Sequence, residues 1–221
     1  MTRIKQVMPN IDDKELKYIT QSIQEGWLTE GPNSQEFIRH IKKFTGSKYA
    51  VLAPNGTLGL FLGLLALGLP RGSEVIVPSF TFFASASSVI FAGLRPVFVD
   101  VDIETFNIDC NKVESLITDK TKAIMPVHIY GHSANMDKVM SIAEKYNLKV
   151  IEDAAQAYGV KYKNKHCGIL GDVSVISFFA DKTITMGEGA VVLTQSNKLS
   201  LIHISEPTRL LSISYAVFCL K

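Results

Sequence analysis

An acidic and a basic side chain stand near the ends of two apolar runs. Asp153 ends Lys149-Val-Ile-Glu-Asp153, and Lys182 follows Val173-Ser-Val-Ile-Ser-Phe178. An enzyme that uses pyridoxal phosphate needs such a pair, because the amine forms a Schiff base and the carboxylate keeps the pyridine nitrogen protonated. If both side chains face one cavity, the pair supports carbanion chemistry at an amine-bearing carbon. The alternatives are that Asp153 caps a following helix and that Lys182 lies on the surface.

Two other places in the chain could hold a phosphate. The segment Asn55-Gly-Thr57 lies between an apolar run and a helical pattern. Free N–H groups at a helix N-terminus favour anions, and Gly56 allows close approach. Ser177 ends another apolar run and offers a hydroxyl. The simpler alternatives stay open: Asn55 or Thr57 only caps the helix, and Ser177 bonds to its own backbone.

Other side chains suit a planar cofactor or a metal ion. Gln156, three residues after Asp153, could meet a ring hydroxyl, or it is only solvated. Phe82 could stack on a planar ring, although an aromatic residue in an apolar segment is more often part of the core. His128 and His132 are four residues apart, but no helix is expected there. We therefore expect no metal site.

Segments of helical period alternate with short apolar runs along the chain. The predicted helices cover residues 12–25, 34–44, 57–67, 83–91, 111–117 and 136–146. The predicted strands cover residues 49–53, 74–78, 95–100, 122–127, 149–152, 173–178 and 190–194. Continuous apolar strands separated by helices predict an α/β fold, with a largely parallel sheet covered on both faces.

Ligands of such sheets bind at the carboxyl ends of the strands. Polar residues stand at or just past five of the predicted strand ends, namely Asn55, Ser79, Asp100, His128 and Asp153. The predicted fold therefore gathers the candidate site residues at one edge of the sheet.

The composition argues against several classes of protein. The 221 residues carry 23 basic and 21 acidic side chains, a net charge of +2 that is too balanced to indicate a nucleic-acid or membrane partner. Three widely spaced cysteines argue against a disulfide framework and suit a reducing compartment. No apolar run reaches the ~18–20 residues of a membrane span, and the start shows no secretory signal. We expect a cytoplasmic protein.

Several motifs, in their order along the chain, resemble one family. They are Gly26-Trp-Leu-Thr-Glu-Gly-Pro32, Asn55-Gly-Thr57, Ser73-Glu-Val-Ile-Val-Pro-Ser-Phe-Thr-Phe82, Pro96-Val-Phe-Val-Asp-Val-Asp102, Val127-His-Ile-Tyr-Gly131, Ile151-Glu-Asp-Ala-Ala-Gln156 and the stretch from Ser177 to Gly187-Glu-Gly189. From about residue 8 to 200 the chain is similar to the DegT/DnrJ/EryC1/StrS sugar aminotransferases, which are fold-type I pyridoxal phosphate enzymes. The resemblance implies their three-layer αβα large domain with a mostly parallel central sheet, and the absence of their small C-terminal domain.

The resemblance also implies a role for each candidate residue. Lys182 matches the lysine that forms the Schiff base, Asp153 the partner of the pyridine nitrogen and Gln156 the partner of the ring hydroxyl. Phe82 would stack on the ring. The phosphate would be held by Gly56, Thr57 and Ser177. A lysine at position 182 implies transamination, because a family branch with histidine there deoxygenates sugars.

The implied reaction is a ping-pong transfer of an amino group from glutamate or glutamine to a keto-sugar nucleotide, at a site built across a homodimer. The alternatives are a pyridoxal phosphate-dependent sugar dehydratase, a regulatory paralogue and an inactive truncated fragment. The sugar, the nucleotide and the pathway (a surface polysaccharide or a glycosylated metabolite) stay open.

The end of the chain breaks the pattern. Residues 1–200 are predicted to form the N-terminal segment and large domain of the aminotransferase. Residues 201–221 keep no helical period and include an uncharged, β-rich stretch that would favour aggregation on a sheet edge. This tail resembles the translated read-through of a sequencing adapter; the alternative is a native, irregular C-terminus.

Overall fold

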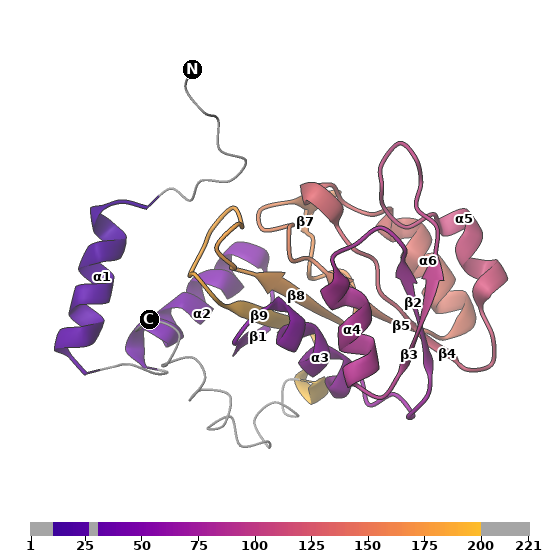
Figure 1. The fold of residues 1–221 in the computed structure, drawn as a ribbon, viewed down its shortest axis with the longest axis horizontal. Helices are drawn as coiled ribbons and strands as arrows, with labels where there is room; N and C mark the ends of the chain where they lie inside the picture. The colour runs from indigo at the N-terminus through magenta and orange to yellow at the C-terminus, as the bar shows by residue number, and fades with distance from the viewer. Residues whose placement is uncertain (1–10, 27–30, 200–221) are drawn as a thin grey trace.

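The computed structural model describes residues 11–26 and 31–199 (Figure 1). Its helices are α1 (Asp13–Gln24), α2 (Pro32–Thr45), α3 (Gly56–Ala66), α4 (Phe83–Phe91), α5 (Cys110–Val113) and α6 (Met136–Tyr146), with short 3-10 helices at Glu114–Leu116 and Ile129–Gly131. Its strands are β1 (Tyr49–Ala53), β2 (Glu74–Pro78), β3 (Arg95–Val99), β4 (Thr121–Ile124), β5 (Lys149–Asp153), β6 (Lys161–Tyr162), β7 (Lys165–His166), β8 (Val173–Ser177) and β9 (Ala190–Thr194). All the predicted helices and strands appear; some have the predicted bounds, and the others, with α5 taken together with the 3-10 helix that follows it, differ from them by up to three residues at an end.

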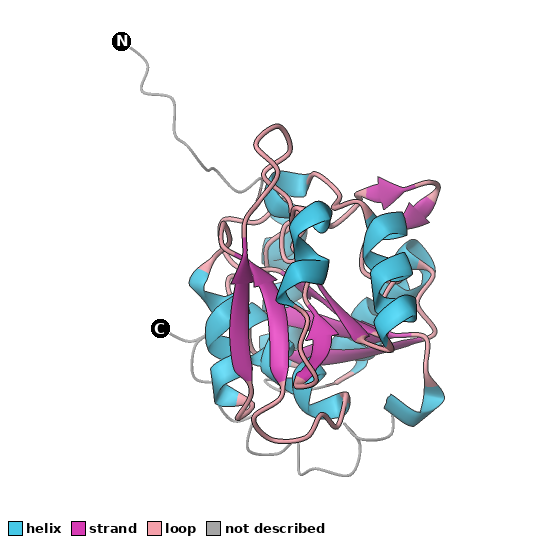
Figure 2. Cartoon of the chain, turned by 90° about the vertical axis from the view of Figure 1, so that its right-hand side faces the viewer, coloured by secondary structure: helices cyan, strands magenta, loops and turns pink. Residues whose placement is uncertain are grey.

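Seven strands form one sheet in the order β1-β9-β8-β5-β4-β2-β3. β9 runs antiparallel to both of its neighbours, and the other pairs are parallel. The largely parallel sheet was predicted, whereas the reversed direction of β9 and the small β6–β7 hairpin were not. Figure 2 shows helices on both sides of the sheet and the hairpin away from it.

Successive residues of the strands face different helices. Val75 and Val77 of β2 pack in the same apolar cluster as Leu60 of α3. Ile76, between them, packs with Val139 of α6 on the opposite face. A third cluster joins the sheet to α2. Because both faces are covered, the strands read as continuous apolar runs, and the fold has the three α/β/α layers that were predicted.

Two glycines let α3 lie close to the sheet. A Cβ atom on Gly59 would lie 2.8 Å from Val175 of β8, and one on Gly63 would lie 2.9 Å from both Ile151 and Val173. Such distances are too short for real carbon contacts, so a side chain at either position would push α3 away from the strands. This close packing places the first residue of α3, Gly56, beside the end of β8.

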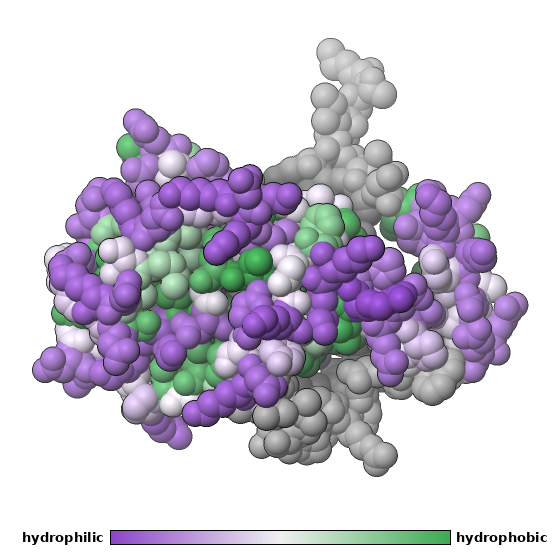
Figure 3. Space-filling model, turned by 180° about the vertical axis from the view of Figure 1, so that it is seen from behind, coloured by the Kyte–Doolittle hydropathy of each residue, from purple (hydrophilic) through white to green (hydrophobic). Residues whose placement is uncertain are grey.

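α1 stands apart from the sheet in Figure 1 and buries none of its residues. Its apolar side chains Leu16 and Ile19 are exposed, as are Phe83 and Phe91 of α4. Apolar residues also reach the surface on the side opposite to that of Figure 1, between polar ones (Figure 3). Exposed apolar area of this kind is typical of a surface that binds another part of a protein.

Several predictions concern residues outside this description. The tail, 201–221, lies outside the described residues, as do residues 27–30 of the first motif. Among the helices of residues 11–26 and 31–199, none is long and apolar enough to cross a membrane.

Candidate active site

The fold brings four of the predicted residues to one edge of the sheet. Asp153 ends β5, Ser177 ends the adjacent β8, and Gly56 with Thr57 opens α3. Asp153 pairs in register with Val175, two residues before Ser177. A Cβ atom built on Gly56 would lie 3.3 Å from the Cβ of Ser177. The candidate site is therefore formed by the carboxyl ends of two strands and the N-terminus of one helix.

Asp153 is buried, with 4% of its surface exposed. Its Oδ2 accepts a 2.6 Å hydrogen bond from the Ser85 hydroxyl, and its Oδ1 accepts one of 3.1 Å from the N–H of Ala155. Burial raises the pKa of Asp153, while the Ser85 and Ala155 hydrogen bonds and the charge of Lys182 act to lower it. No helix directly follows β5 in the described chain, so the helix-cap alternative is wrong.

Lys182 is not a solvated surface lysine. Its side chain is 19% exposed, and its Nζ lies 3.4 Å from Oδ1 of Asp181. Its backbone N–H donates to the carbonyl of Phe179, within the turn that follows β8. The Lys182 charge is one of the influences that act to lower the pKa of Asp153.

The N-terminus of α3 has the features of a phosphate site. Oδ1 of Asn55 caps the helix by accepting the N–H of Leu58 at 3.0 Å, so the capping alternative is correct for Asn55. The N–H groups of Gly56 and Thr57 have no acceptor within the helix, as in any first turn. The Ser177 oxygen accepts the N–H of Phe179 at 3.3 Å, which leaves its hydroxyl hydrogen available. These donors fit a phosphate group.

The side chain of Gln156 is held by a hydrogen bond, whereas that of Phe82 is exposed to solvent. Oε1 of Gln156 accepts a 2.6 Å hydrogen bond from the N–H of Tyr130, which orients the side chain and leaves its NH₂ group as a donor. Phe82 is 74% exposed at the N-cap of α4, so the alternative that it belongs to the core is wrong.

A buried acid next to Asp153 was not recognised from the sequence. Glu152 is fully buried, and its carboxylate accepts hydrogen bonds from Nε2 of His128 at 3.0 Å and from the N–H groups of Gly168, Leu170 and Gly171 at 2.8, 2.7 and 2.7 Å. Burial acts to raise the pKa of Glu152, but the hydrogen bond from His128 and those from the backbone N–H groups hold it below its ordinary value. An acid inside an apolar strand was the signal that could have found this residue.

His128 links this acid to Asp153. Its Nδ1 accepts the N–H of Ala134 at 3.1 Å, so the proton of the neutral ring is on Nε2 and is donated to Glu152. The backbone N–H of His128 donates to the carbonyl of Asp153. Residues 11–26 and 31–199 hold no cluster of three or more side chains that could bind a metal ion.

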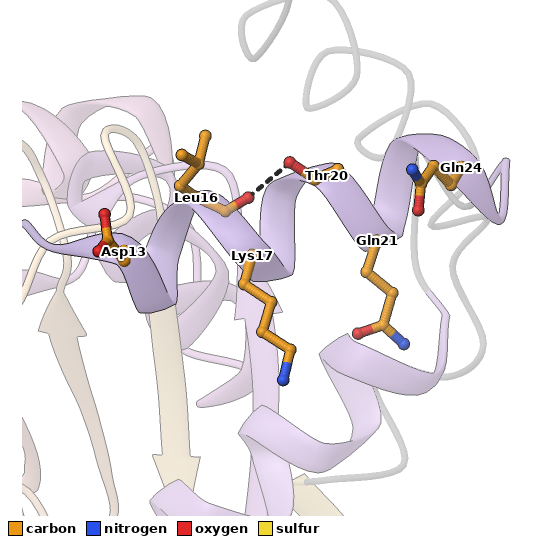
Figure 4. A pocket seen from close by; sticks show the side chains of 6 residues that line it. All are labelled: Asp13, Leu16, Lys17, Thr20, Gln21 and Gln24. Carbon is orange, nitrogen blue, oxygen red and sulfur yellow. Dashed lines mark hydrogen bonds between the residues drawn. The ribbon is translucent and has the colours of Figure 1, made fainter.

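One surface hollow, of about 520 Å³, lies away from these residues (Figure 4). The described residues that line it all belong to α1: Asp13, Leu16, Lys17, Thr20, Gln21 and Gln24. It contains none of the candidate site residues.

Comparison with known proteins identifies the family. The model of the DegT/DnrJ/EryC1/StrS aminotransferase family matches residues 9–205. The chain belongs to this family. It is 44% identical over 201 residues to the GDP-perosamine synthase of Caulobacter vibrioides, covering 90% of this chain and 54% of that protein. It is 39% identical over 193 residues to the spore coat polysaccharide biosynthesis protein SpsC of Bacillus subtilis, covering 87% and 50%.

Solved structures of DegT/DnrJ/EryC1/StrS aminotransferases and similar enzymes share the fold. An aminotransferase from Psychrobacter cryohalolentis has a TM-score of 0.84 at 39% identity, covering 87% of this chain and 49% of that one. The sugar aminotransferase Spr1654 of Streptococcus pneumoniae, described as putative, has a TM-score of 0.85 in its PLP form at 28% identity, covering 98% and 57%. The chain thus spans about half the length of the relatives it matches. The family consists of aminotransferases that depend on pyridoxal phosphate.

Proposed function

We propose that this chain is the large-domain part of an aminotransferase that moves an amino group from glutamate or glutamine to a keto-sugar nucleotide. The observation that carries the proposal is that buried Asp153, the start of α3 at Gly56 and the end of β8 at Ser177 lie at one sheet edge. The charge of Lys182 acts to lower the pKa of Asp153, which is consistent with this arrangement. The relatives support the substrate class, since two are GDP-perosamine synthases and another, DesI, was crystallised in the presence of its TDP-sugar product.

The residues present fit pyridoxal phosphate. When bound, this cofactor supplies an aldehyde that condenses with amines and a ring that accepts the electron pair of a deprotonated carbon. Asp153 would accept the N–H of the pyridine ring, and the NH₂ group of Gln156 would donate to the ring hydroxyl. Phe82 would cover one face of the ring. The phosphate would accept hydrogen bonds from the N–H groups of Gly56 and Thr57 and from the hydroxyl of Ser177.

Lys182 would act twice. Its amine would serve as the nucleophile toward the aldehyde of the cofactor, and it would also serve as the base that takes the proton from the amine-bearing carbon of the substrate. Burial of Asp153 assists both steps, because a carboxylate interacts more strongly with a ring N–H where water is excluded. The resemblance to the family implies transamination rather than deoxygenation, because Lys182 stands where the deoxygenating branch has histidine.

Gly56→Ala is expected to weaken cofactor binding. The added methyl group would lie 3.3–3.4 Å from the Ser177 side chain and take up space that the phosphate needs. We expect about a tenfold higher Kd for pyridoxal phosphate, about 1.4 kcal/mol, in an equilibrium titration. Leu65→Ala, at the exposed far end of α3, is the control and should bind as the unchanged chain does. Equal affinities for all three proteins would place the phosphate elsewhere.

The proposed function is tested by titrating the chain with pyridoxal phosphate and reducing the complex with borohydride. A visible Schiff-base absorbance and a reduced adduct on Lys182 are expected. Amino transfer is then assayed with glutamate or glutamine and a keto-sugar nucleotide. Deoxygenation of the sugar would identify a dehydratase, cofactor binding without turnover would favour a regulatory protein, and no binding would identify an inactive fragment.

The proposed partner is a second copy of the same protein. The exposed apolar side chains of α1 and α4, among them Leu16, Ile19, Phe83 and Phe91, support a surface that becomes buried on assembly. Sedimentation equilibrium should give twice the mass of one chain. A single-chain mass at all concentrations would contradict the homodimer.

A further inference from the structure

A chain of two hydroxyl groups leads to the carboxyl of Asp153. The Oγ1 of Thr81 lies 2.7 Å from the Oγ of Ser85, and the Oγ of Ser85 lies 2.6 Å from Oδ2 of Asp153. Ser85 is fully buried in the first turn of α4, and Asp153 is buried at the end of β5. The two residues are 68 positions apart in the sequence, so only the folded chain joins them.

The direction of these hydrogen bonds follows from the carboxylate of Asp153, which is the last acceptor in the series. An ionised carboxylate only accepts, so the Ser85 hydroxyl must donate to Asp153. The Ser85 hydroxyl has one hydrogen, and it is then used. The contact with Thr81 must therefore have Thr81 as its donor. Thr81 fixes the rotation of the Ser85 hydroxyl, and Ser85 fixes the orientation of the carboxylate.

We propose that Ser85 is a positioning residue that keeps Asp153 ionised and holds its carboxylate in a fixed orientation, ready to accept the ring N–H of the cofactor. That the ligand of Asp153 is pyridoxal phosphate rests on the proposed function. The effect of Ser85 on the Asp153 carboxyl is independent of that function. A buried carboxylate without donors takes up a proton, and a neutral carboxyl lacks the negative charge that stabilises a charged ring N–H.

Other groups also face Asp153. The neutral ring of His128 lies nearby. The charge of Lys182 acts to lower the pKa of Asp153, and the N–H of Ala155 bonds its other oxygen, but the Ser85 hydrogen bond is the largest of the influences that oppose burial. Glu152, the next residue, is occupied by four donors of its own. Loss of the Ser85 hydroxyl alone should therefore raise the pKa of Asp153 further.

The effect on stability has a definite sign. Because the pKa of Asp153 in the folded chain lies above its ordinary value, the folded state loses stability as the pH rises through that pKa. Ser85→Ala should raise the pKa of Asp153 in the folded chain further. The loss of folding stability would then extend to higher pH and become larger. The stability difference between Ser85→Ala and the unchanged chain should then grow as the pH rises and level off once Asp153 is ionised in both proteins. All other titrating groups are shared and cancel in the difference.

The test measures urea unfolding of the cofactor-free chain across a pH series, for the unchanged protein, Ser85→Ala and Ser88→Ala. Ser88 is the matched control, because it is equally buried on α4 but its hydroxyl donates to the backbone carbonyl of Ser85 at 3.1 Å. A difference that depends on pH for Ser85→Ala and is constant for Ser88→Ala is expected. A constant difference for both variants would overturn the proposal, since a merely structural hydroxyl gives a pH-independent loss.

The second readout is the pH profile of pyridoxal phosphate affinity. Ser85→Ala should bind about tenfold more weakly at neutral pH and approach the unchanged chain at alkaline pH. Thr81→Val should give a smaller shift in the same direction, because Ser85 keeps its hydrogen. If the unchanged chain binds no cofactor, the proposed function fails, and the unfolding series still decides the role of Ser85. Identical affinity profiles would overturn the positioning of the carboxylate toward the ring.

Discussion

Lys182→Ala is expected to abolish both the Schiff-base absorbance with pyridoxal phosphate and amino transfer. The substitution removes the nucleophile and the base together, and the base alone typically contributes about 10²–10⁴-fold to a rate. Lys182→Arg keeps a positive charge that can act on Asp153 but cannot form the Schiff base. It should therefore retain more cofactor affinity than Lys182→Ala while having no activity. Absorbance and initial rates on the same samples measure both effects.

Lys165→Ala is the control for these variants, because Lys165 is exposed in the β6–β7 hairpin. It should behave as the unchanged chain does. Mapping the borohydride-reduced peptide locates the modified lysine directly. An adduct that persists in Lys182→Ala, on another lysine, would show that Lys182 is not the nucleophile.

Glu152→Ala is expected to be the most destabilising of the proposed substitutions. It leaves the N–H groups of Gly168, Leu170 and Gly171 and the Nε2–H of His128 without their buried acceptor. Removal of one partner from a buried charged network typically costs about 3–5 kcal/mol. We expect a fall of that size in the free energy of unfolding, measured with urea at neutral pH.

Glu104→Ala, at an exposed position, should change the free energy of unfolding by less than about 0.5 kcal/mol. The pH dependence gives a further check. Because the pKa of Glu152 is held below its ordinary value, its stabilising effect is present above the unfolded pKa and is lost as the pH falls through the folded pKa. The free energies of unfolding of Glu152→Ala and the unchanged chain, plotted against pH, should therefore converge in acid. Curves that stay a constant distance apart would contradict an ionised Glu152.

The pKa values of the adjacent carboxyls of Glu152 and Asp153 are thus shifted in opposite directions, so the two carboxyls affect the pH dependence of stability with opposite sign. Both are buried in β5, but successive strand residues point to opposite faces of the sheet. Glu152 meets three backbone donors and a histidine, which outweigh the effect of burial, whereas Asp153 has fewer donors and its pKa stays raised. An Asp153 without a full set of protein donors retains the capacity to accept one from a ligand.

Much of the fold could be predicted because local pattern and tertiary environment agree. β1, β2 and β9 have the predicted bounds, since each is a short apolar run between polar or glycine-containing turns. The direction of β9 could not be predicted, because apolar runs of parallel and antiparallel buried strands look alike. The β6–β7 hairpin was missed because two-residue strands carry no measurable period.

The candidate site was only partly visible in the sequence. Asp153 and Ser177 could be found because polar residues that end apolar strands of a parallel sheet share one edge. Ser85 could not, because nothing in a stretch of small residues on α4 marks the hydroxyl that meets Asp153. The role of Glu152 as an acceptor for the 168–171 loop depends on where that loop returns, which is a property of the folded chain.

The pairing of β1 with β9 has a consequence for the order of assembly. Tyr49 of β1 lies opposite Thr194, and the Ser47 hydroxyl bonds to the Thr194 carbonyl across 147 positions. On the ribosome, β1 is therefore made well before β9 and stays without this sheet partner until β9 has emerged. The Asn55–Thr57 turn follows β1 directly. The corner where this turn meets the end of β8 is thus completed only after β9 has been made, and this long-range closure favours slow folding.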